Sequence, residues 1–197
     1  MKDTITNIFL VRHGQTLWNL EQRWQGNQNS NLTDEGINQA KITKGKLSKQ
    51  LLHKGYVSPL QRARDTMQII IQDRNLEVEV VDDIREINLG PWEGKTQDET
   101  AISHPIEFKA FWNTPKTFLL QGAETFEELQ SRVVRGIRRI FLENEGKNII
   151  VVSHWISIKV ALAFYKKQPL SFLPQMKNPK NAEVLCLRKI GENICIL

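Results

Sequence analysis

The stretch FLVRHGQTLWN, Phe9 to Asn19, places an arginine and a histidine at the end of an apolar run. The residues from Ile8 to Val11 are continuously apolar, which is typical of a buried β-strand. Arg12 and His13 follow this strand directly. The sequence around the stretch has to explain why a core strand ends on two such side chains.

The length and composition limit the possible answers. The chain has 197 residues, 40% of them hydrophobic, which suffices for one domain of ordinary size with its own core. We therefore expect a single domain over residues 1–197. The run Ile8–Val11 is too short for a signal peptide or a membrane span, and no later run reaches the required length. We interpret the protein as soluble and cytoplasmic, without a membrane partner.

The charged and sulfur-containing residues exclude some function classes. Cys186 and Cys195 lack CxxC spacing, which argues against a zinc site or redox pair and favours buried free thiols. The net charge of +5 permits anionic partners. The densest basic cluster comprises Arg132, Arg135, Arg138 and Arg139. We interpret it as a solvated helix surface, with structural ion pairs or a polyanion site as alternatives. No aromatic side chains interleave these arginines, which argues against nucleic acid.

Apolar periodicity and capping residues predict alternating strands and helices. We expect strands at 8–11, 56–58, 77–81 and 148–153, helices at 33–51, 58–72, 124–144 and 156–165, a helical region rich in Trp and Phe after Gly94, and a closing hairpin of 184–187 with 194–197. Ser58 and Pro59 resemble a helix cap followed by a first-turn proline. The run NIIVVS, 148–153, is uniformly apolar, which indicates a central parallel strand covered by helices on both faces. The expected fold class is α/β, a three-layer α/β/α sandwich with a mostly parallel central sheet.

Unusual polar residues follow each predicted parallel strand. Arg12 and His13 follow the first strand, and Arg62 follows the second. Glu86 follows the third strand, and His154 follows the fourth. Because ligands bind at the carboxyl ends of the strands in open α/β sheets, we expect these side chains to meet in one crevice.

Two guanidiniums and two imidazoles in one crevice suit a small, doubly charged anion such as phosphate. A lone carboxylate repels phosphate unless it is protonated, which would make Glu86 a proton donor to a leaving-group oxygen. Histidine is the best available nucleophile, because the sequence contains none of the motifs GxSxG, HExxH, GxxxxGK[ST] and GxGxxG.

The motifs that carry these residues resemble those of the histidine phosphatase superfamily, also called the phosphoglycerate mutase-like family. The similar blocks, in chain order, are LVRHGQTLWN, RWQG, LTDEGINQA, VSPLQRARDT, REINLGPWEG, GAETFEEL and VVSH. They span nearly the whole chain. The resemblance implies a phosphoglycerate mutase-like fold, and RWQG with the short chain is similar to the small phosphatase branch.

The resemblance also implies a role for each matching residue. His13 would be the nucleophile that becomes phosphohistidine, and Glu86 would protonate the departing alkoxide and then activate water. The residues that would bind the phosphoryl oxygens are Arg12, Arg62, His154, Asn19 and Gln25. No metal or other cofactor is implied, because the fixed cations take the part that Mg²⁺ plays elsewhere. The expected activity is that of a phosphoric monoester hydrolase acting on small-molecule phosphate esters.

Alternatives to a phosphatase are a bisphosphoglycerate-dependent phosphoglycerate mutase and a non-catalytic protein that binds a phospho-ligand. Trp155 stands where family members usually carry glycine, so its side chain must either turn away from the pocket or narrow it. The physiological substrate and the oligomeric state lie beyond what the sequence indicates.

Overall fold

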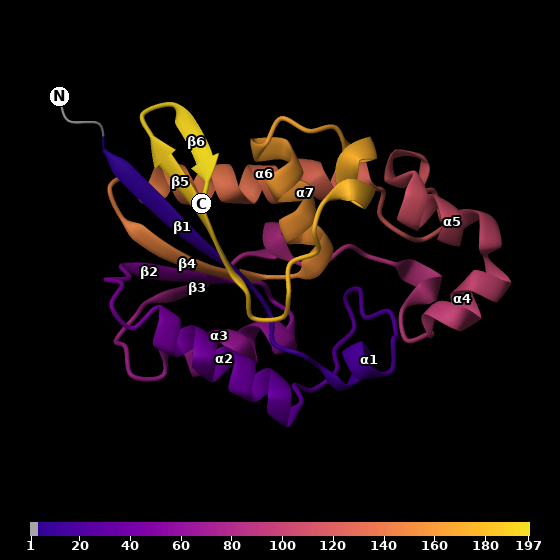
Figure 1. The fold of residues 1–197 in the computed structure, drawn as a ribbon, viewed down its shortest axis with the longest axis horizontal. Coiled ribbons are helices and arrows are strands. Elements are labelled where there is room, and N and C mark those ends of the chain that lie inside the picture. Colours follow the sequence, from indigo (N-terminus) through magenta and orange to yellow (C-terminus); the bar gives the residue numbers. More distant parts are fainter. Residues whose placement is uncertain (1–3) are drawn as a thin grey trace.

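The computed structural model describes residues 4–197. Its centre is a six-stranded sheet with the strand order β3-β2-β4-β1-β5-β6 (Figure 1). The strands are β1 (Ile5–Arg12), β2 (Lys54–Val57), β3 (Val78–Val80), β4 (Asn148–Ser153), β5 (Val184–Ile190) and β6 (Asn193–Ile196). Strands β1 to β4 are parallel, whereas β5 pairs antiparallel with both β1 and β6. The predicted, mostly parallel sheet is confirmed.

Helices cover both faces of the sheet, which confirms the three layers. On one face lie α2 (Asp34–Lys46) and α3 (Gln61–Ile71), and on the other lie α6 (Phe126–Glu143) and α7 (Trp155–Tyr165) (Figure 1). The side chains of β4 alternate between the two cores: Ile149 and Val151 pack with α6 and α7, whereas Ile150 and Val152 pack with α2 and α3. This alternation explains why the whole strand is apolar.

Three shorter helices extend beyond the carboxyl edge of the sheet. They are α1 (Leu17–Leu20), α4 (Gln97–Ser103) and α5 (Pro105–Asn113). Helix α2, in the connection from β1 to β2, covers one face of the sheet. Helix α7, which follows β4, covers the other face (Figure 1). Neighbouring strands whose connections leave toward opposite faces open a crevice at their carboxyl ends. That crevice lies between β1 and β4.

Two expected helix boundaries are wrong. Helix α3 begins at Gln61, after an extended Leu60 that makes no side-chain cap, so Ser58 and Pro59 do not start it. The Ser58 hydroxyl instead lies 2.6 Å from Nε2 of His154. Helix α2 ends at Lys46 and does not continue to residue 51 as expected, and Leu51 is 71% exposed.

The expectations for the cysteines and the arginine cluster need correction as well. Both thiols are free, but Cys186 is only half-buried and Cys195 is exposed. Arg135, Arg138 and Arg139 lie on the exposed side of α6, as expected for a solvated surface. Arg132 is buried and forms an ion pair with Glu124. It lies three residues after Leu129 and four before Gly136, both buried, so helical spacing places it on the inner face.

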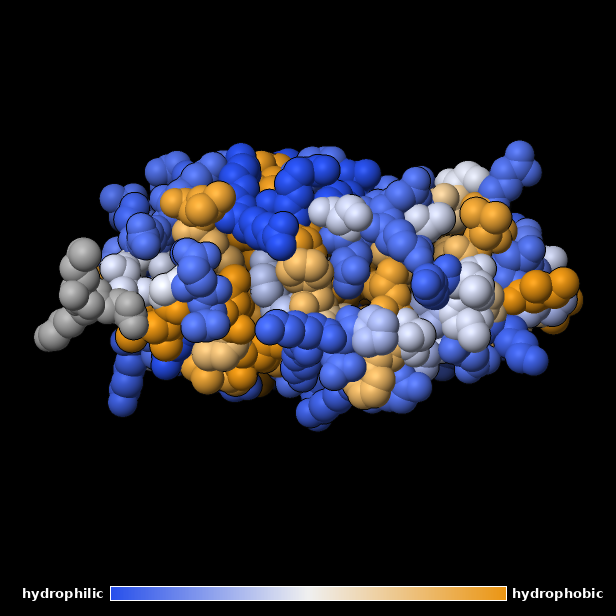
Figure 2. Space-filling model, turned by 90° about the horizontal axis from the view of Figure 1, so that it is seen from above, coloured by the Kyte–Doolittle hydropathy of each residue, from blue (hydrophilic) through white to orange (hydrophobic). Residues whose placement is uncertain are grey.

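Seen from above the view of Figure 1, the surface is largely hydrophilic with hydrophobic groups interspersed (Figure 2). Within residues 4–197, no helix combines the length and the apolar character needed to cross a membrane.

Candidate active site

The two predicted histidines lie side by side at the carboxyl edge of the sheet. In the parallel ladder of β1 and β4, Arg12 is the partner of Ser153, and the backbone N–H of His13 donates to Ser153 O at 3.0 Å. The next residue of each segment is therefore a histidine. The His13 and His154 ring centroids are 5.2 Å apart, and both side chains are buried.

The ring of His13 presents an unprotonated nitrogen. Its Nδ1 lies 2.7 Å from the carbonyl oxygen of Gly14, which assigns the proton to Nδ1 and a lone pair to Nε2. Burial lowers the pKa of His13 well below its usual range, and the charges of Arg62 and Arg12 add to this effect. The imidazole is therefore neutral at neutral pH. Arg62 Nε donates to the Nε2 lone pair at 3.3 Å.

The ring of His154 is held by the hydroxyl of Ser58. Its Nε2 lies 2.6 Å from Ser58 Oγ, whereas its buried Nδ1 has no hydrogen-bond partner among residues 4–197. Burial is the largest cause that lowers the pKa of His154 well below its usual range, followed by the charge of Arg62. His154 is fully buried, and its ring lies next to that of His13.

The two predicted arginines flank His13. Arg62 on α3 is 1% exposed, and its guanidinium donates to the carbonyl oxygens of Gln28 and Gly26. Arg12 donates from Nη1 to Pro179 O at 2.9 Å, and its buried Nε has no hydrogen-bond partner in the part of the chain that the structure describes. Burial lowers the pKa of both guanidiniums to about 10, partly opposed by the charge of Glu86. Both remain protonated at neutral pH.

Glu86 lies at the N-terminus of α7, where the helix dipole favours a carboxylate. Its Oε1 accepts hydrogen bonds from the backbone N–H groups of Ile87 at 3.0 Å and Ser157 at 3.1 Å, and it lies 3.1 Å from the Ser157 hydroxyl. Its Oε2 accepts only one, from the Ile156 N–H at 3.2 Å. Oε2 therefore has more free acceptor capacity than Oε1.

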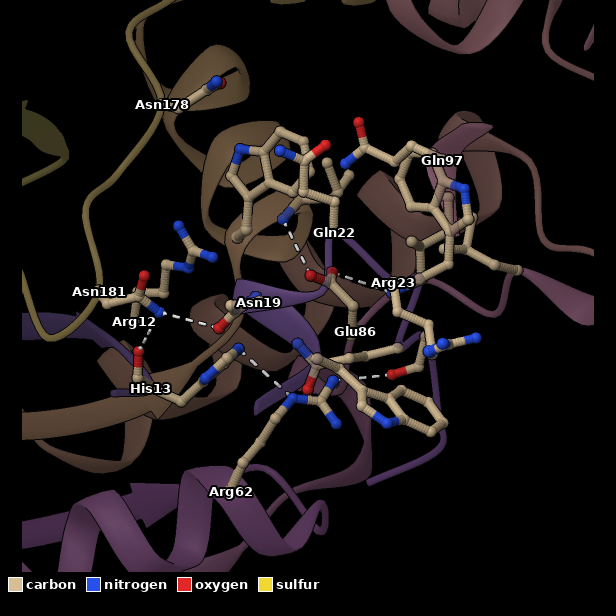
Figure 3. A pocket seen from close by; sticks show the side chains of 18 of the residues that line it. Arg12, His13, Asn19, Gln22, Arg23, Arg62, Glu86, Gln97, Asn178 and Asn181 are labelled. Carbon is tan, nitrogen blue, oxygen red and sulfur yellow. Dashed lines mark hydrogen bonds between the residues drawn. The ribbon is translucent and has the colours of Figure 1, made fainter. Parts of the chain in front are cut away.

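A cavity of about 340 Å³ joins these groups (Figure 3). Six of the seven predicted site residues line it, namely Arg12, His13, Asn19, Gln25, Arg62 and Glu86. The carbonyl oxygen of the Gln25 side chain is buried without a hydrogen-bond partner. A bound ligand with a hydrogen-bond donor could supply the partner that this buried oxygen lacks.

The sequence did not indicate several amide side chains that also line the cavity, which are Gln15, Gln22, Gln97, Asn178 and Asn181. Asn181 donates to the carbonyl oxygen of His13 at 3.1 Å and to Asn19 Oδ1 at 3.4 Å (Figure 3). It lies in a segment after the proline-containing turn at Leu170–Gln175, where no motif or periodicity marked a functional residue.

Trp155 narrows the cavity. Its indole is half-buried, lines the cavity wall, and packs against Trp112 in a tilted arrangement with ring centroids 5.6 Å apart. The guanidinium of Arg12 lies 5.9 Å from the centre of the same indole. The side chain that replaces the usual glycine therefore contacts a predicted phosphate ligand.

Known proteins resemble this chain in sequence and fold. A bifunctional protein of Mycobacterium tuberculosis is 36% identical over 162 residues, a match that covers 82% of this chain and 44% of that protein. Phosphoserine phosphatase 1 of Hydrogenobacter thermophilus is 31% identical over 155 residues, covering 79% of this chain and 74% of that one. The structure of Bacillus stearothermophilus YhfR superposes with a TM-score of 0.95 at 33% identity, covering 97% of this chain and 95% of that one.

The chain spans 44% of the length of the mycobacterial relatives that it matches. The sequence model of the histidine phosphatase superfamily (branch 1) matches residues 8–194. This range begins inside β1, ends inside β6, and contains every residue of the site described above. The chain belongs to branch 1 of the histidine phosphatase superfamily.

Proposed function

We propose that the protein is a phosphatase that hydrolyses small phosphate monoesters through a phosphohistidine intermediate and needs no metal ion. The observation that carries the proposal is the state of His13, a neutral imidazole whose Nε2 lone pair accepts a hydrogen bond from the Arg62 guanidinium, in a cavity that the Arg12 guanidinium also lines. A phosphoryl group bound by those guanidiniums would present its phosphorus atom to that lone pair.

The phosphate would bind to charges that are already in place. At an effective dielectric constant of about 20, one cation at about 4 Å attracts a unit negative charge by about 4 kcal/mol before desolvation is subtracted. The unpartnered Nε of Arg12 and the buried Nδ1 of His154 are two polar atoms that a phosphoryl oxygen could satisfy. Arg12, Arg62 and His154 are therefore the proposed phosphate ligands, supplemented by Asn19 and Gln25.

The reaction would proceed in two displacements. In the first, His13 Nε2 forms a bond to phosphorus while the P–O bond to the alcohol breaks, and Glu86 transfers its proton to the leaving oxygen. In the second, water attacks the phosphohistidine, Glu86 takes up a proton from that water, and the P–N bond breaks. Inorganic phosphate leaves, and His13 and Glu86 return to their starting states.

The test is phosphate release from a panel of monoesters with a chelator present. The panel contains p-nitrophenyl phosphate, glycerol 3-phosphate, phosphoserine and 3-phosphoglycerate. The wild type should release phosphate and His13→Ala should not, while His53→Ala, which changes an exposed histidine, serves as the matched control.

Two results would contradict the proposal. Activity retained by His13→Ala would exclude the phosphohistidine route. No release by the wild type from any ester would exclude phosphatase activity on these substrates, and isomerisation of 3-phosphoglycerate in the presence of bisphosphoglycerate would then favour the mutase.

A further inference from the structure

A buried ion pair lies beside the loop that carries Glu86. Arg132 on α6 donates from Nε to Glu124 Oε1 at 2.6 Å and from Nη2 to Glu124 Oε2 at 2.8 Å. The two side chains are 8% and 11% exposed. This two-bond geometry is the strongest arrangement that an arginine and a carboxylate adopt.

The same guanidinium also binds the backbone of the loop. Its Nη1 donates to the carbonyl oxygens of Asp83 and Arg85 at 2.9 and 2.8 Å, and its Nη2 donates to that of Glu86 at 2.9 Å. All five N–H groups of Arg132 are thereby used. Glu124 Oε2 accepts a further hydrogen bond, from the Asn88 N–H at 3.2 Å. The Arg132–Glu124 pair therefore holds the backbone on both sides of Glu86.

The packing of α6 permits this contact. Gly136 lies one helical turn after Arg132, and a Cβ at that position would lie 2.8 Å from Asp83 Cβ. The glycine thus allows the helix to approach the loop closely. On the other side of the loop, the Ser157 hydroxyl donates to Arg85 O at 2.6 Å. The loop is held between α6 and α7.

We propose that Arg132 and Glu124 are positioning residues that fix Glu86 where it can protonate the leaving group. The inference rests on the proposed function, because it takes Glu86 to be the general acid. Helix α7 binds the Glu86 carboxylate, whereas the Arg132–Glu124 pair binds the Glu86 backbone. Both ends of the side chain must be fixed for its Oε2 to meet the leaving oxygen.

The readout is the dependence of the rate on the leaving group. An alkyl ester such as glycerol 3-phosphate needs a proton on the departing oxygen, whereas p-nitrophenyl phosphate needs it far less. A misplaced acid therefore slows the alkyl ester selectively. A pair that only stabilised the fold would affect both esters equally.

The test measures kcat/KM for both esters in three variants whose folding is checked by circular dichroism. Arg132→Lys keeps the positive charge, but the ammonium group has fewer N–H donors than the guanidinium and lacks its planar geometry. Glu124→Gln keeps the shape, and the double variant Arg132→Met with Glu124→Gln removes both buried charges, so that neither is left unpaired. The control is Arg135→Ala on the same helix, which breaks only an exposed ion pair with the Asp83 side chain.

We expect the variants to lose at least tenfold more activity on glycerol 3-phosphate than on p-nitrophenyl phosphate, and the control to match the wild type. In a Glu86→Gln background, Arg132→Lys should cause no further selective loss. Equal losses on both esters, or a selective loss that persists without Glu86, would overturn the inference. A wild type inactive on both esters would instead refute the proposed function.

Discussion

The imidazole of His154 lies 2.6 Å from the hydroxyl of Ser58, and both residues are fully buried. Ser58 directly follows β2, and its backbone N–H donates to Val152 O at 3.1 Å. The hydrogen bond thus joins the ends of two neighbouring strands. It fixes the orientation of the His154 ring and leaves Nδ1 as the nitrogen without a partner.

Replacing Ser58 by alanine should lower kcat by about tenfold. This corresponds to the loss of one hydrogen bond that contributes about 1 kcal/mol to holding the His154 ring in place. The reason is that the His154 ring would no longer be held toward the proposed phosphate site. The measurement is steady-state kinetics of Ser58→Ala, His154→Ala and the double variant. In the double variant the serine change should add nothing to the histidine change. Fully additive losses would mean that Ser58 acts independently of His154.

The meeting of the two histidines was predictable from the sequence because parallel strands align their carboxyl ends. His13 and His154 each follow a continuously apolar strand, and such strands lie centrally in α/β sheets. The register that pairs Arg12 with Ser153 then places the histidines together. Arg62 and Glu86 were predictable for the same reason, although each lies several residues beyond its strand.

Other parts of the site were not predicted, each for its own physical reason. The Ser58-Pro59 pair has the pattern of a helix start, but the Ser58 hydroxyl forms a hydrogen bond with His154 instead of capping a helix. Arg132 was grouped with three neighbouring arginines that lie off the apolar face of the helix, although its own spacing from Leu129 and Gly136 places it inward. Asn181 reaches the site through a segment without secondary structure, and no periodicity reports on such a segment.

Glu86→Gln should separate the two kinds of ester. Glutamine preserves the size of the side chain but cannot donate an acidic proton. We expect a loss of about 10²- to 10⁴-fold in kcat/KM for glycerol 3-phosphate, the usual range for general acid catalysis, and a much smaller loss for p-nitrophenyl phosphate. Parallel losses for the two esters would show that Glu86 is not the acid.

The buried His13 should make the protein less stable in mild acid. Unfolding returns its pKa to about 6.5, whereas burial holds the pKa well below that value in the folded protein. Below pH 6.5 the unfolded chain therefore binds one more proton, and stability falls as the pH falls until the folded pKa is reached. Above pH 6.5 His13 is neutral in both states and contributes no pH dependence.

The expected slope for one such histidine is about 1 kcal/mol per pH unit. Urea unfolding at pH 7.5, 6.5 and 5.5 should show a steeper loss of stability for the wild type than for His13→Asn below pH 6.5. His53→Asn, at an exposed position, is the matched control. Parallel curves for the wild type and His13→Asn would contradict the expectation.

Trp155 should set the size of the ester that the cavity accepts, because its indole forms part of the wall beside Arg12. Trp155→Ala would enlarge the cavity while keeping a good helix former at the first position of α7. We expect kcat/KM for a bulky ester such as naphthyl phosphate to rise at least fivefold relative to glycerol 3-phosphate. Trp112→Ala is the control, because Trp112 packs behind Trp155 without lining this cavity. An unchanged ratio in Trp155→Ala, or the same change in Trp112→Ala, would mean that the indole does not select substrates by size.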